Sequence, residues 1–416
     1  MQMMKGEKNV PKVRFPGFTD DWEQRKLGEC CNIFAGGTPS TSQKEYWENG
    51  DVNWLPSGNI QDCYIYESDI KTKITKLGLE KSSAKIIKRD TALLAMTGAT
   101  CGKSAYLTCD SSANQSVMAF ETDLLDSKML FYIFQKNKDY ILKFQAGGAQ
   151  AGINKDTCQN LSFMFPQIEE QKEIGAFLMN LDSLITLQQR KLDAMKEYKK
   201  GMLQNMFPKE GESVPEVRFP GFTGEWERRK LGDISDFITK GATPTTYGFD
   251  WVDNGILFFR NDAIKDNQFV YGDYSFISEE ANEVLKRSEI TGDDILIAIT
   301  GDIGKVGIVP KIIKKANINQ HTARVRVLRD AVPYFVYQSL ATDIQQRKYK
   351  KIKTGLSMPQ LSLEQIRDTM IYCPSIDEQF KISDTLTNLD TLISLHQRKL
   401  EAMKEYKKGM LQQMFV

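Results

Sequence analysis

The sequence predicts an α+β fold, with two similar mixed α/β domains and two long helices that form an antiparallel coiled coil. Three observations predict it. Two domain starts repeat almost unchanged, and so do two long segments with apolar residues at heptad spacing. Short apolar runs bounded by turn residues, typical of strands, lie between them. The 416 residues also exceed what one ordinary core holds, so more than one domain is expected.

The internal repeat is the strongest signal in the sequence. Residues 13–29 match residues 217–233 at 13 of 17 positions, and residues 181–207 match residues 389–415 at 22 of 27 positions. A period near 205 residues is far longer than the roughly 20–45 residues of solenoid repeats, so it indicates a duplicated domain. These repeated segments are nearly identical in the two copies, whereas the domain interiors between them differ. Such a pattern suits two different targets presented at a fixed geometry.

The interiors keep a few landmarks at matching positions, despite their divergence. These are Gly36–Ser40 with Gly241–Thr245, Ala95–Gly98 with Ala298–Gly301, Gly102-Lys103 with Gly304-Lys305, Asn114-Gln115 with Asn319-Gln320, and Pro166–Gln171 with Pro374–Gln379. They place both copies in one common fold.

Each half is expected to contain short strands followed by a helix. Predicted strands are Val52–Leu55, Lys85–Ile87, Thr91–Met96, Ser104–Leu107 and Val117–Glu121 in the first half, and Ile256–Phe259, Asp294–Ile299, Val306–Val309 and Thr322–Leu328 in the second. The predicted helices are Lys128–Phe144 and Pro333–Lys348. The expected division is a first domain over 1–165, a helix over 166–208, a linker over 209–216, a second domain over 217–373 and a helix over 374–416.

The two long helices are predicted from an apolar seam that continues for about four heptads. Its core residues are Leu181, Ile185, Leu192 and Met195 in the first copy and Leu389, Ile393, Leu400 and Met403 in the second. Polar seam positions are expected to pair with their equivalents, Gln188 with His396 and Lys199 with Lys407. Ser375 and Glu378 fit a capping box at the start of the second helix. Nothing local buries so long a stripe, so each helix is the expected partner of the other.

Composition narrows the class of protein. The net charge of +1 neither indicates nor excludes a nucleic-acid partner, because a phosphate-binding face needs only a local excess of cations. The seven cysteines form no CxxC pair and only two histidines are present, which does not favour a zinc site, and no metal is expected. No apolar run is long enough to span a bilayer, and the first residues do not form a signal peptide. We therefore expect a cytoplasmic protein with reduced thiols.

No catalytic motif is found. Gly98–Ser104 resembles a P-loop, but it has three residues between its glycines where the motif needs four, and its counterpart at Gly301–Val306 has two. A tight turn that carries a lysine is the preferred interpretation. Rossmann, metalloprotease, nuclease and nucleophile–histidine patterns are also missing. We expect no catalytic residues in this chain.

Polar loop residues are the candidates for DNA contact. The segment Arg347–Lys353 carries five positive charges in seven residues, which include Lys351 and Lys353, and it leads into Thr354–Ser357. The matching segment of the first half, Lys136–Lys143, has fewer charges and leads into Gly147–Gln150. A solvated helix end is the alternative interpretation. Arginine reads guanine and Asn or Gln reads adenine in the major groove. The further candidates are Thr38, Ser40, Ser57, Asn59, Lys103 and Gln115 in the first half, and Thr243, Thr245, Arg260, Asn261, Lys305, Gln320 and His321 in the second.

This layout resembles the specificity (S) subunits of type I restriction–modification systems. The resemblance is carried by the Val-Arg-Phe-Pro-Gly-Phe starts, the Gly-x-Thr-Pro loops, the Thr-Gly…Gly-Lys turns and the Pro-x-Ile-x-Glu-Gln helix entries, and it covers essentially the whole chain. It implies that each variable half is a target-recognition domain for one part of a bipartite double-stranded DNA sequence, and that the helices set the length of the unread spacer.

The resemblance also implies partners and cofactors. Modification (M) subunits, commonly two, would dock on this chain, bind S-adenosylmethionine and methylate adenine. Restriction (R) subunits would join them for a reaction that depends on ATP and magnesium. This chain would bind no cofactor and catalyse nothing itself. Two other classes stay open: a self-contained modification enzyme, for which no cofactor motif is found, and a scaffold or adaptor whose duplicated domains bind proteins.

Overall fold

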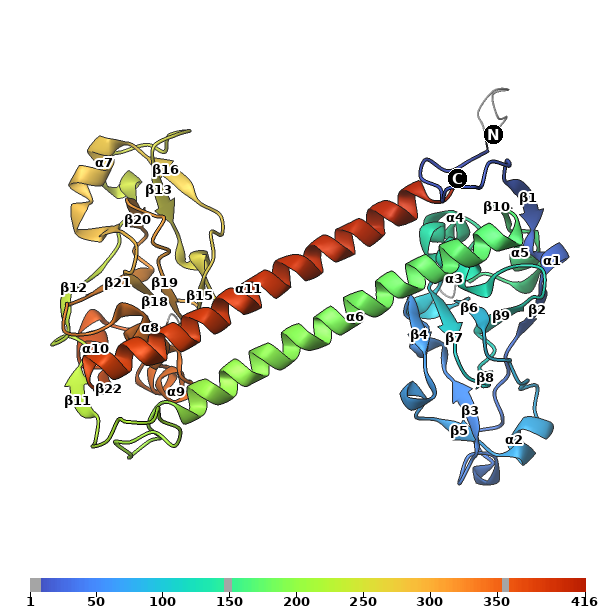
Figure 1. Cartoon of the computed structure of the whole chain (residues 1–416), viewed down its shortest axis with the longest axis horizontal. Coiled ribbons are helices and arrows are strands. Elements are labelled where there is room, and N and C mark those ends of the chain that lie inside the picture. The colour runs from blue at the N-terminus through green and yellow to red at the C-terminus, as the bar shows by residue number, and fades with distance from the viewer. Residues whose placement is uncertain (1–8, 146–151, 354–358) are drawn as a thin grey trace. The chain divides into compact units, whose positions relative to one another are not determined.

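The computed structural model describes residues 9–145, 152–353 and 359–416. It divides into two units of packing. Unit 1 extends to Gln189 and also contains Arg398–Val416, and unit 2 comprises Arg190–Gln397. The division falls within both long helices, α6 (Ile168–Asn205) and α11 (Ile376–Gln413), which are continuous (Figure 1). Each unit therefore contains one α/β domain, the end of one long helix and the start of the other.

The domain of unit 1 is built on a five-stranded sheet in the order β2-β9-β6-β7-β4. A three-stranded sheet, β5-β3-β8, and a strand pair, β1-β10, complete it. The strands are β1 (Glu23–Lys26), β2 (Asn32–Ala35), β3 (Val52–Leu55), β4 (Cys63–Ile65), β5 (Lys73–Ile74), β6 (Thr91–Ala95), β7 (Ser104–Leu107), β8 (Ser112–Ala113), β9 (Val117–Glu121) and β10 (Ser162–Phe165). The helices are α1 (Leu27–Cys30), α2 (Lys76–Glu80), α3 (Ser127–Lys136), α4 (Lys138–Leu142) and α5 (Lys155–Asn160).

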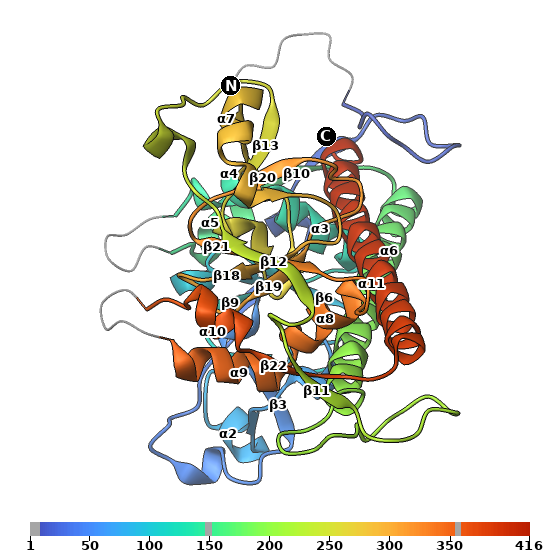
Figure 2. The same ribbon diagram turned by 90° about the vertical axis from the view of Figure 1, so that its left-hand side faces the viewer.

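Unit 2 repeats this plan with a four-stranded sheet, β12-β21-β18-β19, and a second sheet, β16-β13-β20-β17. Two strand pairs, β14-β15 and β11-β22, accompany them. The strands are β11 (Glu227–Lys230), β12 (Ser235–Lys240), β13 (Ile256–Phe259), β14 (Ile264–Lys265), β15 (Gln268–Phe269), β16 (Ser275–Ile277), β17 (Glu289–Ile290), β18 (Ile295–Ala298), β19 (Val306–Ile308), β20 (Ala316–Ile318), β21 (Thr322–Val327) and β22 (Met370–Cys373). The helices are α7 (Glu279–Val284), α8 (Pro333–Ala341), α9 (Asp343–Ile352) and α10 (Leu363–Arg367). Within this unit α7 lies beside β13 and β20, and α9 lies beside α10 (Figure 2).

Two local predictions were wrong. Lys85–Ile87 is not a strand, since only Ile87 makes an isolated bridge, to Ser111. Each predicted domain helix is two helices, α3 with α4 and α8 with α9. The second break is set by Thr342, whose hydroxyl accepts a hydrogen bond from the amide of Gln345 and so starts α9.

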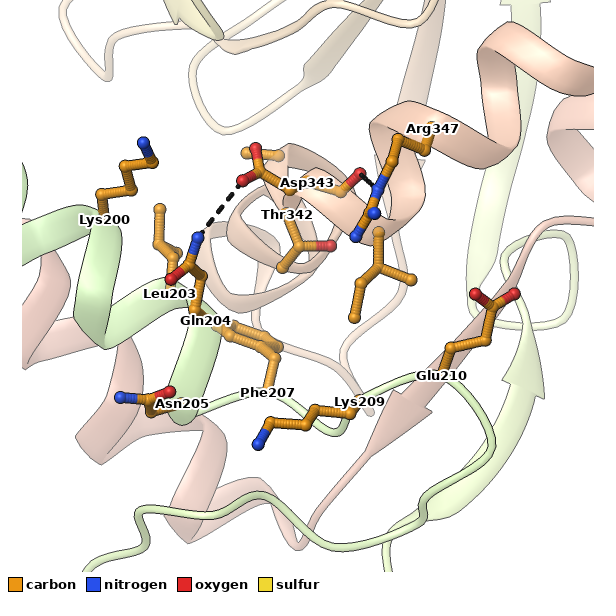
Figure 3. Close-up of a pocket in the computed structure, with 12 residues that line it drawn as sticks. Lys200, Leu203, Gln204, Asn205, Phe207, Lys209, Glu210, Thr342, Asp343 and Arg347 are labelled. Carbon is orange, nitrogen blue, oxygen red and sulfur yellow. Dashed lines mark hydrogen bonds between the residues drawn. The ribbon is translucent and has the colours of Figure 1, made fainter.

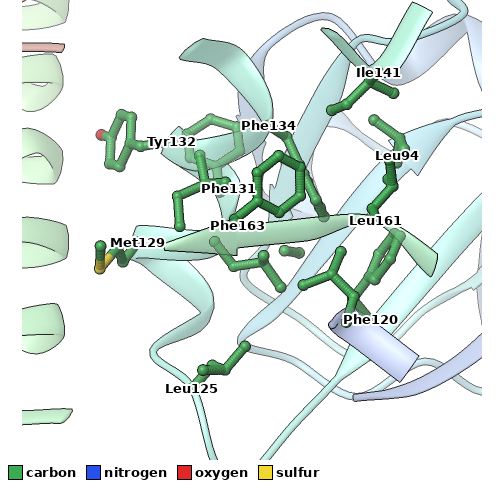
Figure 4. Packing of buried hydrophobic residues seen from close by; sticks show 14 of the residues in the cluster. Leu94, Phe120, Leu125, Met129, Phe131, Tyr132, Phe134, Ile141, Leu161 and Phe163 are labelled. Atoms are coloured by element: carbon green, nitrogen blue, oxygen red, sulfur yellow. The ribbon is translucent and has the colours of Figure 1, made fainter. Parts of the chain in front are cut away.

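The main core of unit 1 lies between α3, the five-stranded sheet and the long helices. Its buried aromatic side chains include Phe120, Phe131, Tyr132 and Phe134 (Figure 4), and the rings of Phe120 and Phe134 lie 4.8 Å apart. Phe415, which follows α11, is buried in the same core with its ring 6.3 Å from that of Trp22. The core of unit 2 takes Phe207, which follows α6, beside Trp226 in the same way. Each domain core is thus completed by a helix end that comes from the other repeat.

A buried ion pair explains why the domain starts and the helix entries recur together. Arg14 donates two hydrogen bonds of 2.7 Å to Glu170, and Arg218 makes the same fork to Glu378 at 2.7 and 2.8 Å. Hydrogen bonding to the carboxylate raises the pKa of both arginines, so they stay charged. The capping box at Ser375 is therefore only half correct. Ser375 accepts from the amide of Glu378 at 3.4 Å, but the Glu378 carboxylate serves Arg218.

The long helices run antiparallel. In unit 1 Lys407 of α11 forms an ion pair with Asp182 of α6 at 2.6 Å, and in unit 2 Lys199 of α6 forms one with Asp390 of α11 at 2.7 Å. The predicted pairing of Lys199 with Lys407 was wrong, because in an antiparallel pair equivalent residues meet only near the midpoint. The seam residues Leu181, Leu192, Leu389, Ile393 and Leu400 are buried, and Ile185, Met195 and Met403 are half-buried. This burial is what a coiled-coil seam requires.

Candidate nucleic-acid interface

The candidate residues of the first half gather at one edge of the five-stranded sheet, which we call loop edge 1. Strands β2 and β6 end at this edge, and β9, β7 and β4 begin there, because β9 is antiparallel to both β2 and β6 and β7 is antiparallel to β6. The segments that leave or enter these strand ends form the edge: Gly36–Ser40, Ser57–Asp62, Met96–Lys103 and Asn114–Ser116. Strand polarity alone thus brings together loops that are up to about 80 residues apart in sequence.

Loop edge 2 is the equivalent edge in unit 2. Strands β12 and β18 end there and β21 and β19 begin there, with Lys240 paired to Ala323 and Ile297 paired to Val306. Strand β13 ends beside the end of β20, since Phe259 is paired in parallel with Ile318. The edge therefore carries Gly241–Thr245, Arg260–Ala263, Ile299–Lys305 and Asn319–His321.

A threonine–glutamine hydrogen bond stands at the same place on both loop edges. The Thr38 hydroxyl donates to Oε1 of Gln115 at 2.5 Å, and the Thr243 hydroxyl donates to Oε1 of Gln320. Both glutamines are exposed. The bond ties the Gly-x-Thr-Pro loop to the segment before β9 or β21 and holds an amide at the surface, where amides can read adenine.

The two edges differ next to this bond. On loop edge 2, His321 lies between Gln320 and Thr300. The His321 Nε2 atom is 3.2 Å from the side-chain nitrogen of Gln320, and the His321 Nδ1 atom is 2.8 Å from the hydroxyl oxygen of Thr300. Loop edge 1 has Ser116 at the position of His321. The two loop edges thus share the same threonine–glutamine hydrogen bond but present different polar side chains beside it, as expected if each contacts a different base sequence.

The two lysine turns are tight turns and not phosphate-binding P-loops. Gly98 and Gly102 have φ of +72° and +77°, and Gly301 and Gly304 have φ of +70° and +82°, a left-handed conformation that only glycine adopts readily. A side chain on Gly304 would also collide with Tyr349 of α9. The turns present Lys103 and Lys305, and Lys103 donates to Oε1 of Gln61.

The third candidate group is a short turn that packs on the lysine turn. In unit 1 this is Ser57–Asn59, whose Ser57 carbonyl accepts from Thr100 at 3.1 Å and whose Asn59 carbonyl accepts from the Cys63 thiol at 3.7 Å. In unit 2 the side-chain nitrogen of Asn261 lies within 3.5 Å of the position that a Cβ on Gly301 would occupy. The structure therefore places Ser57, Asn59 and Asn261 beside the turns of Lys103 and Lys305.

Arg260 is the exposed cation of this group, and it is held in place. Its guanidinium lies 5.6 Å from the centre of the Trp251 ring, and it donates to the Ser275 hydroxyl at 3.1 Å. Unit 1 has Pro56 at the same position. An arginine fixed by stacking loses little side-chain entropy when it binds, which suits bidentate contact with guanine or a phosphate.

The remaining candidates lie farther along the same loops or on a neighbouring helix end. Ser40 and Thr245 are exposed, and the Ser40 hydroxyl is 2.8 Å from that of Ser42. Lys351 and Lys353 are exposed at the end of α9, and α9 packs on loop edge 2 because Gln346 donates to the Gly304 carbonyl at 2.6 Å. The adjoining segments Gly147–Gln150 and Thr354–Ser357 lie outside the described residues.

Four residues that contact the candidate side chains Lys103, Arg260 and His321 were not predicted from the sequence: Gln61, Trp251, Ser275 and Thr300. Thr300 could have been found, because Thr97-Gly98 and Thr300-Gly301 are matching landmarks. Trp251 and Ser275 have no sequence signal, because they come to Arg260 through the pairing of β13 with β16 and the bridge between Val252 and Phe276.

A cavity of about 530 Å³ lies elsewhere in unit 2, where the end of α6 meets the start of α9 (Figure 3). Its wall carries the cations Lys200, Lys209 and Arg347 and the anions Glu210 and Asp343. Gln204 donates to Asp343 at 3.4 Å across it. These residues include no nucleophile–base pair, and their three cations exceed the two anions by only one charge, which is little to hold a charged ligand.

Among the described residues, no group of three or more His, Cys, Asp or Glu is arranged to hold a metal ion. Within the same residues, no helix is long and apolar enough to cross a membrane.

Comparison with known proteins identifies the family. The family model described as type I restriction modification DNA specificity domain matches twice, over residues 19–197 and 223–405. The type I restriction enzyme MjaVIII specificity subunit of Methanocaldococcus jannaschii is 22% identical over 99% of this chain and 96% of its own length. The EcoBI specificity subunit of Escherichia coli is 30% identical over 36% of this chain and 32% of its own length.

Solved structures support the same fold. The crystal structure of a type I restriction–modification S subunit from M. genitalium aligns with a TM-score of 0.60 and 16% identity over 98% of this chain and 99% of that one. A chain from a study of the assembly and conformational transition of the type I system aligns with a TM-score of 0.54 and 16% identity over 96% of this chain and 98% of that one. With two family domains over most of its length, this chain belongs to the type I restriction modification DNA specificity domain family.

Proposed function

We propose that the chain is the DNA-recognition subunit of a type I restriction–modification complex, and that each loop edge reads one part of a bipartite double-stranded DNA target. The observation that carries this proposal is the pair of loop edges. Both have the same Thr–Gln bond and the same lysine turn, yet they present Pro56 and Ser116 in one half against Arg260 and His321 in the other. Family membership supports a role in specificity, and its relatives are named specificity subunits, which confirms the prediction of a non-catalytic chain.

The test is to select sequences from random DNA with the purified complex of this chain and its modification subunits. We expect two separated base patterns joined by a spacer of fixed length. Arg260→Ala should relax one or two positions of one half-site and leave the other half-site unchanged, since a bidentate contact is worth about 1–3 kcal/mol of discrimination. Lys311→Ala is the control, because it removes an exposed cation from the connection between the end of β19 and the start of β20, which are the strand ends opposite loop edge 2. Selection of a single continuous site, or of none, would contradict the proposal.

The long helices carry a second surface that fits the proposed modification subunits. Each has an exposed apolar stripe beside the seam, made of Leu184, Leu187 and Tyr198 on α6 and Leu392, Leu395 and Tyr406 on α11. These side chains are 46–65% exposed, and the two stripes correspond residue by residue at the repeat offset. A duplicated apolar surface suits two copies of one partner that packs a helix against it. We therefore propose two modification subunits for each chain.

Native mass spectrometry of the complex tests this stoichiometry. Leu187→Asp and Leu395→Asp should each leave one modification subunit bound, and the double variant should leave none, because a charge in an apolar contact costs far more than the contact gains. Thr186→Asp and Ser394→Asp introduce the same charge at exposed neighbouring positions off the stripes and should keep two. Full assembly of the double variant would reject the docking surface.

The partners' cofactors and the compartment are also part of the proposal. S-adenosylmethionine would be held by the modification subunits, and ATP and magnesium by restriction subunits that join the same complex. We propose a cytoplasmic location, because such a complex must have access to DNA. Ultraviolet crosslinking of labelled S-adenosylmethionine to the assembled complex should mark only the modification subunit; a labelled specificity chain would favour the self-contained modification enzyme instead. A scaffold function would require that the complex protect no DNA sequence.

A further inference from the structure

The same carboxylate stands at the same place in both units and connects three elements. In unit 1 Oδ1 of Asp182 forms an ion pair with Lys407 of α11 at 2.6 Å, while Oδ2 accepts from Tyr132 of α3 at 2.7 Å and from Tyr64 of β4 at 3.1 Å. Figure 4 shows the Tyr132 hydroxyl at the margin of the core, directed toward α6. One side chain thus binds both long helices to each other and to the recognition domain.

Asp390 repeats this division of its two oxygens in unit 2. Its Oδ1 forms an ion pair with Lys199 of α6 at 2.7 Å, and its Oδ2 accepts from Tyr334 and, at 3.2 Å, from Gln338, both on α8. The aspartate and lysine are identical in the two repeats, but the groups from the domain are not: two tyrosines from α3 and β4 in one, a tyrosine and a glutamine from α8 in the other. We call the set of contacts around each of these two aspartates a joint. The residues that the long helices contribute to it are the same in both units, whereas each domain contributes different hydrogen-bond donors.

These contacts are suited to hold an orientation. The side chains of Asp182, Lys407, Asp390 and Lys199 are only 12–23% exposed, so water screens the pairs weakly. Charge-assisted hydrogen bonds are directional and about twice as strong as neutral ones. Burial, reinforced by the nearby carboxylate, raises the pKa of Tyr132 and of Tyr334, so both hydroxyls keep the proton that they donate.

We infer that Asp182 and Asp390 are positioning residues for recognition: each fixes the angle of its domain on the helix pair, and so sets which spacer between half-sites the complex accepts. This inference rests on the proposed reading of a bipartite target. Neither aspartate belongs to a loop edge, so neither should affect which bases are read. Losing one joint should let one domain swing, which widens the range of spacers while the half-site bases stay the same.

The experiment measures binding of the assembled complex to DNAs that carry both half-sites with the preferred spacer, or with one base pair more or fewer. For Asp390→Asn we expect the preference for the correct spacer to fall about tenfold, the effect of losing a charge-assisted bond, with unchanged half-site bases. Tyr334→Phe removes only the hydroxyl and should lower the preference in the same direction. Asp384→Asn, the same substitution at an exposed position on the same helix, should behave as the unmodified protein.

The outcomes separate the two proposals. If the unmodified complex selects no bipartite sequence, the proposed function fails and not the joint. If it does, and Asp390→Asn and Tyr334→Phe keep the original spacer preference, the joint has no positioning role. A change in half-site bases at constant spacer preference would also overturn it. Should Asp390→Asn fail to fold, as judged by thermal unfolding, Tyr334→Phe decides alone, because it leaves the ion pair between the helices intact.

Discussion

Arg218→Met tests whether the buried ion pair secures the domain start to the helix entry. Arg218 binds both oxygens of Glu378, at 2.7 and 2.8 Å, and the Glu378 side chain is only 1% exposed. Methionine keeps most of the aliphatic stem but removes the fork. The carboxylate would then be buried without its cation.

The expected cost follows from that burial. Removing one partner of a buried pair typically costs about 3–5 kcal/mol, because the other charge is left uncompensated. Each 1.4 kcal/mol is about a tenfold change in an equilibrium, so local opening near the pair should become at least about 100-fold more frequent. Glu378→Gln in the same chain removes the uncompensated charge and should recover part of that stability.

Hydrogen exchange followed by mass spectrometry gives both the measurement and its control. Peptides from β22 and the first turns of α11 should exchange at least about 100-fold faster in Arg218→Met. Peptides from β10 and the first turns of α6 lie beside the unchanged pair of Arg14 and Glu170, and they should exchange as before. An acceleration below about tenfold, or an equal one in both sets, would refute the reasoning.

Three further predictions address cores, DNA affinity and thiols. Phe415→Ala should destabilise unit 1 by about 3 kcal/mol and Phe207→Ala should destabilise unit 2 by a similar amount, because each ring is about 95% buried in the core of that unit. Urea unfolding monitored by tryptophan fluorescence measures both losses. An equal loss of stability in both units from one substitution would contradict this prediction. Lys103→Ala and Lys305→Ala should each weaken binding to all DNA sequences alike and lower the slope of log affinity against log salt by about one; a change in selected bases would speak against phosphate contact. Burial raises the pKa of Cys158 to about 12 and that of Cys373 to about 11, so at pH 8 both stay protonated, and mass spectrometry should find them unalkylated by iodoacetamide until the protein unfolds.

The helices and most strands could be predicted because their signals are local. The spacing of Leu181, Ile185 and Leu192 places them on one helix face whatever lies nearby. The candidate loops could be predicted for a different reason, since turns such as those at Gly98 and Gly301 recur at matching positions in the two repeats. What neither signal contains is the arrangement of those loops on one sheet edge, because this depends on the order and polarity of strands that are far apart in sequence.

Pairing between distant residues was the part that sequence reasoning missed or misjudged. Glu378 was assigned to a helix cap because Ser375 stands three residues before it, but the preferred partner of a buried carboxylate is a cation, and Arg218 is 160 residues away. Lys199 was matched with its equivalent Lys407, although antiparallel packing gives each lysine an aspartate instead. In both cases the repeat marked the right residues, and only the structure shows which of them meet.

The exchange of helix ends between the repeats bears on the order in which the chain folds during synthesis. Unit 2 is one continuous segment, Arg190–Gln397, so all of its core is available once that segment has emerged from the ribosome. Unit 1 starts first but needs Met414 and Phe415 to close its core. Until they arrive, Trp22 and its neighbours have an unfilled apolar site. We therefore expect the half that is translated first to be the half that finishes folding last.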